Sequence, residues 1–146
     1  MESYLFSNIN DAAGALVVEG WHKPGSLTKA SGAWIHAAGT ATFSAGSYPI
    51  TSHDQWVWFA VEAGEVTLHW QDTELVLKAE DTCFLPAGEK EAHLTISEQA
   101  HCVWVALEGP LAPMVVRKMG ALLHMPLRQG ALPSQMYLAK QIVQVM

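Results

Sequence analysis

The segment that decides the fold reads Leu75-Val76-Leu77-Lys78-Ala79-Glu80-Asp81-Thr82-Cys83-Phe84-Leu85-Pro86-Ala87-Gly88. Apolar and β-branched residues stand on both sides of the acidic pair Glu80-Asp81, and the second run ends in Pro-x-Gly. Such runs, bounded by turn residues, predict two short strands joined by a tight reversal. We expect these strands over Glu74–Lys78 and Thr82–Leu85.

The same pattern extends outward, from about Ala33 to Leu107. Runs rich in Val, Thr, Ile and aromatic residues are separated by Gly, Asp, Pro or Ser at nearly regular spacing. Hairpin turns are expected at Ala63-Gly64-Glu65 and Gln71-Asp72-Thr73. This regularity predicts antiparallel β structure that closes into a sandwich or barrel. The further expected strands are Trp34–Ala37, Ala41–Phe43, Gln55–Glu62, Val66–Gln71, His93–Ile96 and Cys102–Leu107.

The periodicity changes after Gly109. From Pro110 onward, apolar residues recur at steps of three and four, which predicts a helix with one apolar face and Pro110 in its first turn. Arg117 and Lys118 fall near its C-terminal end, where positive charge suits the helix dipole. The residues of the predicted apolar face are Leu111, Val115, Met119 and Leu122.

A second helix is predicted over about Ser134 to Met146, beyond a connector bounded by Pro126 and Pro133. Leu138, Ile142 and Val145 form its apolar stripe. The sequence ends while this stripe continues, so we expect a further C-terminal part outside it.

Composition excludes several classes of protein. The 146 residues fit a single domain, expected to consist of an N-terminal arm over 1–32, a β-barrel over 33–109 and a helical region over 110–146. A net charge of −6, with eight scattered Lys and Arg, opposes binding to a phosphate backbone, so we expect no DNA-binding domain in this chain. The apolar stretches are too short to span a bilayer, and the N-terminus lacks the pattern of a secretory signal. We therefore expect a cytoplasmic protein.

The two cysteines, Cys83 and Cys102, stand among alternating apolar residues and lack the spacing of metal ligands. A disulfide between them is conceivable. In a reducing compartment, and with a core of this size, we expect buried thiols instead.

Taken together, these segments resemble the cupin-like N-terminal domain of bacterial AraC-type transcription regulators. The matching features are a glycine turn in Ala63–Leu68, the strands and Pro-x-Gly of the segment quoted above, and an aromatic strand that leads into a helix in Cys102–Ala112. The resemblance covers about Trp56 to Met119. It implies a jelly-roll β-barrel followed by two C-terminal α-helices, a small-molecule effector inside the barrel, and pairing of two domains through the helices. Leu138, Ile142 and Val145 are the candidates for that dimer interface.

Three departures from the family pattern bear on the site. The family usually has glycine before the Asp of the turn, so Glu80 brings a Cβ to a position that often needs a positive φ. A His usually follows Pro-x-Gly closely; here either His93 or Glu91 occupies that position. Enzymatic cupins hold a metal with His-x-His and a Glu, whereas Ser52–Ala60 retains His53 and no suitably spaced Glu. We therefore expect neither a metal nor another cofactor.

Six tryptophans and seven histidines supply the candidate ligand-binding residues. Strand alternation places Trp56 and Trp58 on one face. Core packing is the simpler interpretation of any single Trp, and an aromatic wall that stacks an apolar or sugar-like effector in a barrel mouth is the functional one. The resemblance directs His53 and His93 toward the barrel interior. The candidate ligand-binding residues are Trp34, His36, His53, Gln55, Trp58, His93 and Trp104.

These features predict a homodimeric effector-binding domain that controls a helix-turn-helix domain outside this sequence. Effector binding is expected to shift the populations of arm or helix arrangements. No nucleophile motif or paired-carboxylate signature is present, so we do not expect an enzyme. Two alternatives stay open: a stand-alone cupin enzyme, such as a metal-dependent isomerase or oxygenase that uses His53 and His93, and a carbohydrate-binding cupin without a regulatory partner.

Overall fold

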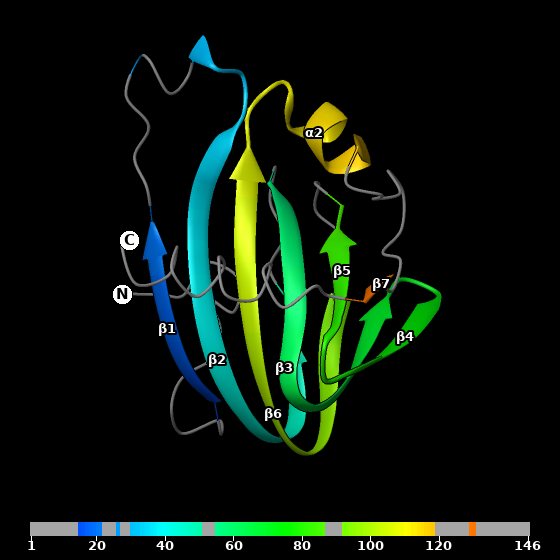
Figure 1. The fold of residues 1–146 in the computed structure, drawn as a ribbon. Helices are drawn as coiled ribbons and strands as arrows, with labels where there is room; N and C mark the ends of the chain where they lie inside the picture. The colour runs from blue at the N-terminus through cyan, green and yellow to red at the C-terminus, as the bar shows by residue number, and fades with distance from the viewer. Residues whose placement is uncertain are drawn as a thin grey trace.

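A computed structural model describes residues 15–21, 26, 30–50, 55–86, 92–118 and 129–130. These residues form one antiparallel sheet in the order β1-β2-β6-β3-β5-β7, with β4 paired to β3 (Figure 1). A mainly β, antiparallel fold is thereby confirmed. The strands are β1 (Ala15–Trp21), β2 (Trp34–Pro49), β3 (Trp56–Trp70), β4 (Thr73–Lys78), β5 (Asp81–Leu85), β6 (Ala92–Glu108) and β7 (Gln129–Gly130), and the helix is α2 (Ala112–Lys118).

Three long strands, β2, β3 and β6, form the centre of the sheet, where the sequence predicted pairs of shorter strands. The prediction of a hairpin turn at Ala63-Gly64-Glu65 is wrong, because the chain does not reverse there. Strand β3 pairs with β6 both before and after Gly64, and the register of the pairing shifts near that residue. Gly64 has φ 84°, and a Cβ there would collide with the carbonyl oxygen of Gln99. Glycine at this position permits a bend in a continuous strand rather than a reversal.

The other two turns follow the sequence more closely. The turn between β3 and β4 is confirmed, with Trp70 opposite Thr73 and Gln71 at φ 50°. In the turn between β4 and β5, Glu80 adopts φ 74°, as its place in the pattern suggested. The Lys78 amide donates to Asp81 Oδ2 over 2.9 Å, and the Glu80 amide donates to the Val61 carbonyl over 2.8 Å. These hydrogen bonds hold a non-glycine residue in the left-handed region.

The N-terminal segment contains a strand that the sequence analysis did not predict. β1 pairs with β2 along its whole length, from Ala15 opposite Phe43 to Trp21 opposite Ala37. The sequence of β1 lacks an alternation of polar and apolar residues, which is why pattern alone gave no strand there. The sheet therefore extends into the region expected to be an irregular arm.

The larger apolar cluster lies on one face of the sheet, which we call the inner face. It joins residues from both halves of the long strands, and its largest fully buried members include Trp70, Trp104, Tyr48, Phe43 and Phe59. The rings of Phe43 and Tyr48 lie 4.7 Å apart across an irregularity in β2 between Ser44 and Gly46. The sheet bends there, so that side chains from both halves of β2 pack together.

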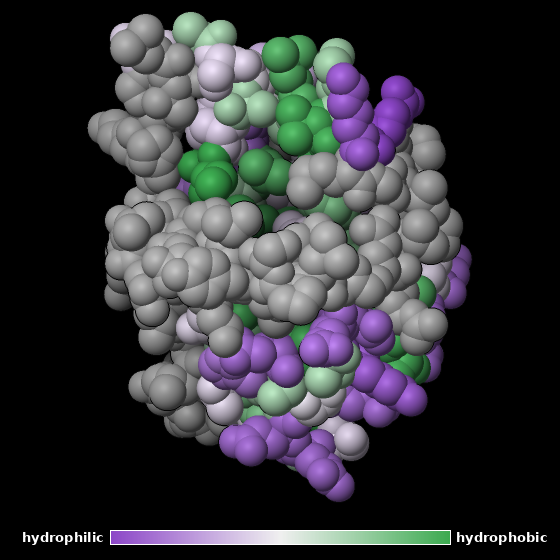
Figure 2. Space-filling model, viewed as in Figure 1, coloured by the Kyte–Doolittle hydropathy of each residue, from purple (hydrophilic) through white to green (hydrophobic). Residues whose placement is uncertain are grey.

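The opposite, outer face carries a second cluster beneath α2. Trp56 and Trp58 share this cluster, which confirms that they lie on one face, and Ala112 and Val116 of α2 pack in it. The apolar face predicted for the helix is displaced by one residue, because Leu111 and Val115 are 44% and 38% exposed. The smaller Ala112 lets the helix backbone approach the sheet. Hydrophobic side chains gather at this upper end of the molecule in Figure 2, next to a hydrophilic group at the upper right, and further hydrophilic side chains cover the lower end.

The predicted second helix, with Leu138, Ile142 and Val145, lies outside the described residues. Within the part that is described, no helix is long and apolar enough to cross a membrane.

Candidate functional site

The start of β2, the start of β3 and the end of β6 meet at one end of the inner face. Trp34 is directly opposite Glu108, and Gln55 immediately precedes β3. Glu108 shares its strand parity with Trp104 and Ala106, both of which belong to the inner cluster. We call Trp34, His36, Gln55 and Glu108 the mouth cluster. The register thus places a carboxylate at the edge of the buried inner face.

Glu108 is the centre of the mouth cluster. Gln55 Nε2 donates to Glu108 Oε2 over 2.6 Å, and His36 Nδ1 lies 3.2 Å from the same oxygen. Gln55 is 9% exposed, and the side chains of His36 and Glu108 are 25% and 31% exposed. The carboxylate is therefore held in one orientation, partly shielded from water.

A β-bulge gives His36 this position. The register changes from Ile35 opposite Leu107 to Ala37 opposite Ala106, which leaves His36 as the extra residue of β2. Bulges re-aim side chains and are frequent beside functional sites. Here the bulge lets His36 reach Glu108 while Ala37 still packs in the inner cluster.

Two indole N–H groups add hydrogen-bonding capacity. Trp34 Nε1 and Trp70 Nε1 are buried and have no hydrogen-bond partner among the described residues. Trp70 lies in the inner cluster, and Trp34 lies in the mouth cluster. An unsatisfied buried donor costs about 1–3 kcal/mol. An acceptor atom from a bound molecule or a water would remove that cost.

The structure brings together four of the predicted site residues. Trp34, His36 and Gln55 meet at the mouth, and Trp104 lies deeper on the same face, fully buried. Sequence reasoning missed Glu108, to which His36 and Gln55 are both joined. The signal was available, since Glu108 follows Trp104 at an even spacing and comes directly after the strand predicted over Cys102–Leu107.

Two predicted residues lie elsewhere. Trp58 is on the outer face in the cluster under α2, so it does not share a pocket wall with Trp104. His93 alternates with Ala92 and Leu94, which pack in the inner cluster, and therefore projects from the outer face. Both assignments to the interior are corrected, because strand register decides which parity faces inward. His53 lies outside the described residues.

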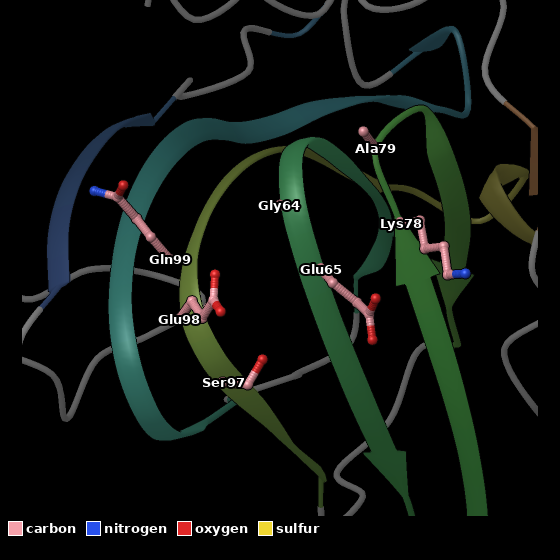
Figure 3. A pocket seen from close by; sticks show the side chains of 7 residues that line it. All are labelled: Gly64, Glu65, Lys78, Ala79, Ser97, Glu98 and Gln99. Carbon is pink, nitrogen blue, oxygen red and sulfur yellow. The ribbon is translucent and has the colours of Figure 1, made fainter.

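A hollow of about 460 Å³ lies at the bend of the sheet, away from the mouth cluster (Figure 3). Glu65 from β3, Lys78 from β4 and Glu98 from β6 stand around it, and all three are exposed. Such an open, charged hollow resembles ordinary protein surface more than an enclosed ligand site.

Metal binding and thiol chemistry have little support on the inner face. The described residues contain no group of three or more His, Cys, Asp or Glu placed to hold a metal ion. Cys83 and Cys102 are free thiols buried in the inner cluster. Burial raises the pKa of Cys83 to about 12, and burial followed by the charge of Cys83 raises the pKa of Cys102 further. Both thiols are therefore protonated and unreactive near neutral pH.

The described residues thus form a bent antiparallel sheet with a buried aromatic cluster on its inner face and hydrogen-bonding groups at the edge of that face. The family model of the AraC-like ligand binding domain matches residues 35–146, so the chain belongs to this family. The resemblance stated from the sequence is thereby confirmed.

One solved structure with a TM-score above 0.5 supports the fold. The protein YhaK from Escherichia coli is similar with a TM-score of 0.58 and 8% identity, over 80% of this chain and 51% of that one. A cupin superfamily protein from Desulfitobacterium hafniense gives 0.48 and 14%, over 63% and 77%. A putative ethanolamine utilization protein from Salmonella typhimurium gives 0.48 and 19%, over 66% and 69%. A search of the curated proteins finds no match.

Proposed function

We propose that the chain is the effector-binding and dimerisation domain of an AraC-type transcription regulator, and that it binds its effector without transforming it. Membership of the ligand-binding family supports effector binding. The observation that supports this position for the effector is the mouth cluster, where His36 and Gln55 hold Glu108 beside the aromatic inner face. Binding there biases a DNA-binding domain carried outside this sequence.

The chemistry of the mouth cluster favours one class of effector. Glu108 presents a partly buried carboxylate, which accepts hydrogen bonds and repels anions. The net charge of −6 adds to that repulsion. Trp34 supplies an apolar surface together with an N–H donor. We propose a neutral polyhydroxylated molecule or an amine, rather than a carboxylate or phosphate.

The test is a titration of the chain with a panel of monosaccharides, polyols and primary amines, with carboxylate analogues as negative probes. Heat of binding and tryptophan fluorescence are recorded. For any compound that binds, Glu108→Gln should weaken binding about tenfold or more, as expected for loss of a charge-assisted hydrogen bond. The matched control Glu98→Gln lies at the exposed bend and should leave the affinity unchanged.

Preferential binding of the carboxylates, or equal loss in both variants, would contradict the proposed site. Recovery of the compound unchanged after prolonged incubation is the expected result for a binding domain. Stoichiometric conversion would instead establish an enzyme.

Dimerisation is proposed through the C-terminal stripe of Leu138, Ile142 and Val145. Sedimentation velocity should show a dimer that Ile142→Asp converts to a monomer, because a buried charge in an apolar interface is strongly unfavourable. Gln144→Asp introduces the same group off the stripe and should leave the dimer intact. A monomeric wild-type chain, or equal dissociation of both variants, would refute this interface.

A further inference from the structure

Three side chains form a row across the outer face, on the far half of the sheet from the mouth cluster. His69 of β3 is directly opposite His93 of β6 and, on its other side, directly opposite Glu74 of β4. Leu68 and Leu94 point into the inner cluster, so the alternate residues His69 and His93 point outward. Two imidazoles and one carboxylate are thus adjacent by strand register.

The two imidazoles lie face to face. Their ring centroids are 4.3 Å apart, and the ring planes differ by 13°. His69 Nδ1 is 3.7 Å from Glu74 Oε2, and His69 Nε2 is 3.1 Å from the hydroxyl of Thr95. A carboxylate beside Nδ1 favours the proton on that nitrogen, which leaves Nε2 to accept the hydrogen bond from the Thr95 hydroxyl of β6. His93 stands on β6, two residues from Thr95.

We propose that His69 and His93 bind a divalent transition-metal ion such as Zn²⁺ between β3 and β6. Neutral imidazole is a preferred ligand of zinc, copper and nickel. With each metal–nitrogen bond about 2.0 Å long, the two ligand nitrogens lie at most about 4 Å apart. Residues directly opposite in an antiparallel pair have Cβ atoms about 4.5–5.5 Å apart, from which two imidazoles can reach one ion. Because the lone pair of a ring nitrogen lies in the plane of its ring, both rings turn out of the stacked arrangement to converge on the ion, and His69 Nε2 exchanges its hydrogen bond with Thr95 for the metal. His69 is 29% exposed, so an ion can approach from solvent.

Glu74 is a positioning residue in this site. Histidines that bind metals usually donate their second N–H to a carboxylate, which fixes the ring and its tautomer. Glu74 stands where it can do this for His69. Water completes the coordination, since the described residues offer no group of three ligands.

This site is independent of the proposed effector site. The histidine pair lies on the outer face, whereas Glu108 and Trp104 lie on the inner face. A substitution that abolishes metal binding should leave effector binding unchanged, and the reverse also holds. The two proposals can therefore be tested separately.

The test is calorimetric titration of the tag-free chain with Zn²⁺, with Mg²⁺ as a hard ion that imidazole does not favour. We expect saturable Zn²⁺ binding, and no Mg²⁺ binding, at the site. His69→Gln and His93→Gln should each weaken Zn²⁺ binding about tenfold or more. Glu74→Gln should weaken it less, because Glu74 acts through His69 and its side chain is 64% exposed. The matched control is His101→Gln, because His101 is also on the outer side of β6 beside a carboxylate, Glu62.

Thermal unfolding gives a second readout that does not depend on activity. Zn²⁺ should raise the unfolding midpoint of the wild type and of His101→Gln, since an ion that joins two strands binds only the folded chain. The midpoint of a His69→Gln/His93→Gln double variant should not respond, although it unfolds normally without metal. Undiminished Zn²⁺ binding by this double variant, or no binding by the wild type, would overturn the proposal.

Discussion

At the scale of single residues, Glu80 is the clearest case of a side chain in a costly backbone conformation. Its φ of 74° lies in the left-handed region, which costs a residue with a Cβ about 1–2 kcal/mol. Glu80→Gly should therefore raise the free energy of unfolding by about 1 kcal/mol in urea titrations. Glu98→Gly is the control on a strand without positive φ, and it should destabilise. A destabilised Glu80→Gly would show that the side chain contributes more than its strain costs.

The buried thiols make stability depend on alkaline pH. Burial raises the folded-state pKa of Cys83 from 9.0 to about 12, and that of Cys102 is raised as well. Above about pH 9 the unfolded chain loses thiol protons that the folded chain keeps, so the free energy of unfolding falls as pH rises. Below that pH the contribution is fully present.

Urea unfolding between about pH 8 and pH 10 tests this expectation. The Cys83→Ala/Cys102→Ala variant should lose stability less steeply with pH than the wild type. Equal slopes would mean that the thiols are not protected from ionisation in the folded chain.

At the scale of elements, α2 is held by a narrow contact with the outer face. Val116 is fully buried in the cluster that contains Trp56 and Trp58. Val116→Ala should lower the free energy of unfolding by about 2 kcal/mol, through lost apolar burial and a small cavity. Met114→Ala, on the 54% exposed side of the same helix, should change it by less than about 0.5 kcal/mol. Equal losses of stability in the two variants would mean that the helix packs on the sheet through a different face.

Sequence patterns located most strands of the sheet but not their continuity. The short predicted strands in β2, β3 and β6 are halves of longer strands that continue through bends. Gly64 has the local chemistry of a hairpin turn, and only the close approach of Gln99 from another strand makes it a bend. Such long-range contacts leave no local signal.

The sequence predicted those residues of the candidate site whose side chains were assigned to the correct face of their strand. Trp34, His36 and Gln55 were selected from their places on expected strands, and they meet at the mouth cluster. Trp58 and His93 were assigned to the wrong face, because a shift of one residue in register exchanges the two faces. Neither error could be detected without the pairing partners of β3 and β6.

At the scale of the whole molecule, the two faces of the sheet divide the chemistry. The inner face combines a buried aromatic cluster with Glu108 at its edge, and the outer face carries the helix contact and the paired histidines. The sheet therefore separates the proposed effector site on the inner face from the proposed metal site on the outer face. The central claim is that small molecules bind on the inner side.

The most direct test of that claim follows the six tryptophan indole N–H signals by NMR, each assigned through a Trp→Phe variant. A bound polyol or amine from the panel should shift the signal of Trp34 most, because Trp34 lies in the mouth cluster and its indole N–H has no acceptor among the described residues. The signals of Trp56 and Trp58, under α2, should move little. Largest shifts at Trp56 and Trp58, with Trp34 unchanged, would place the effector on the outer face and contradict the account.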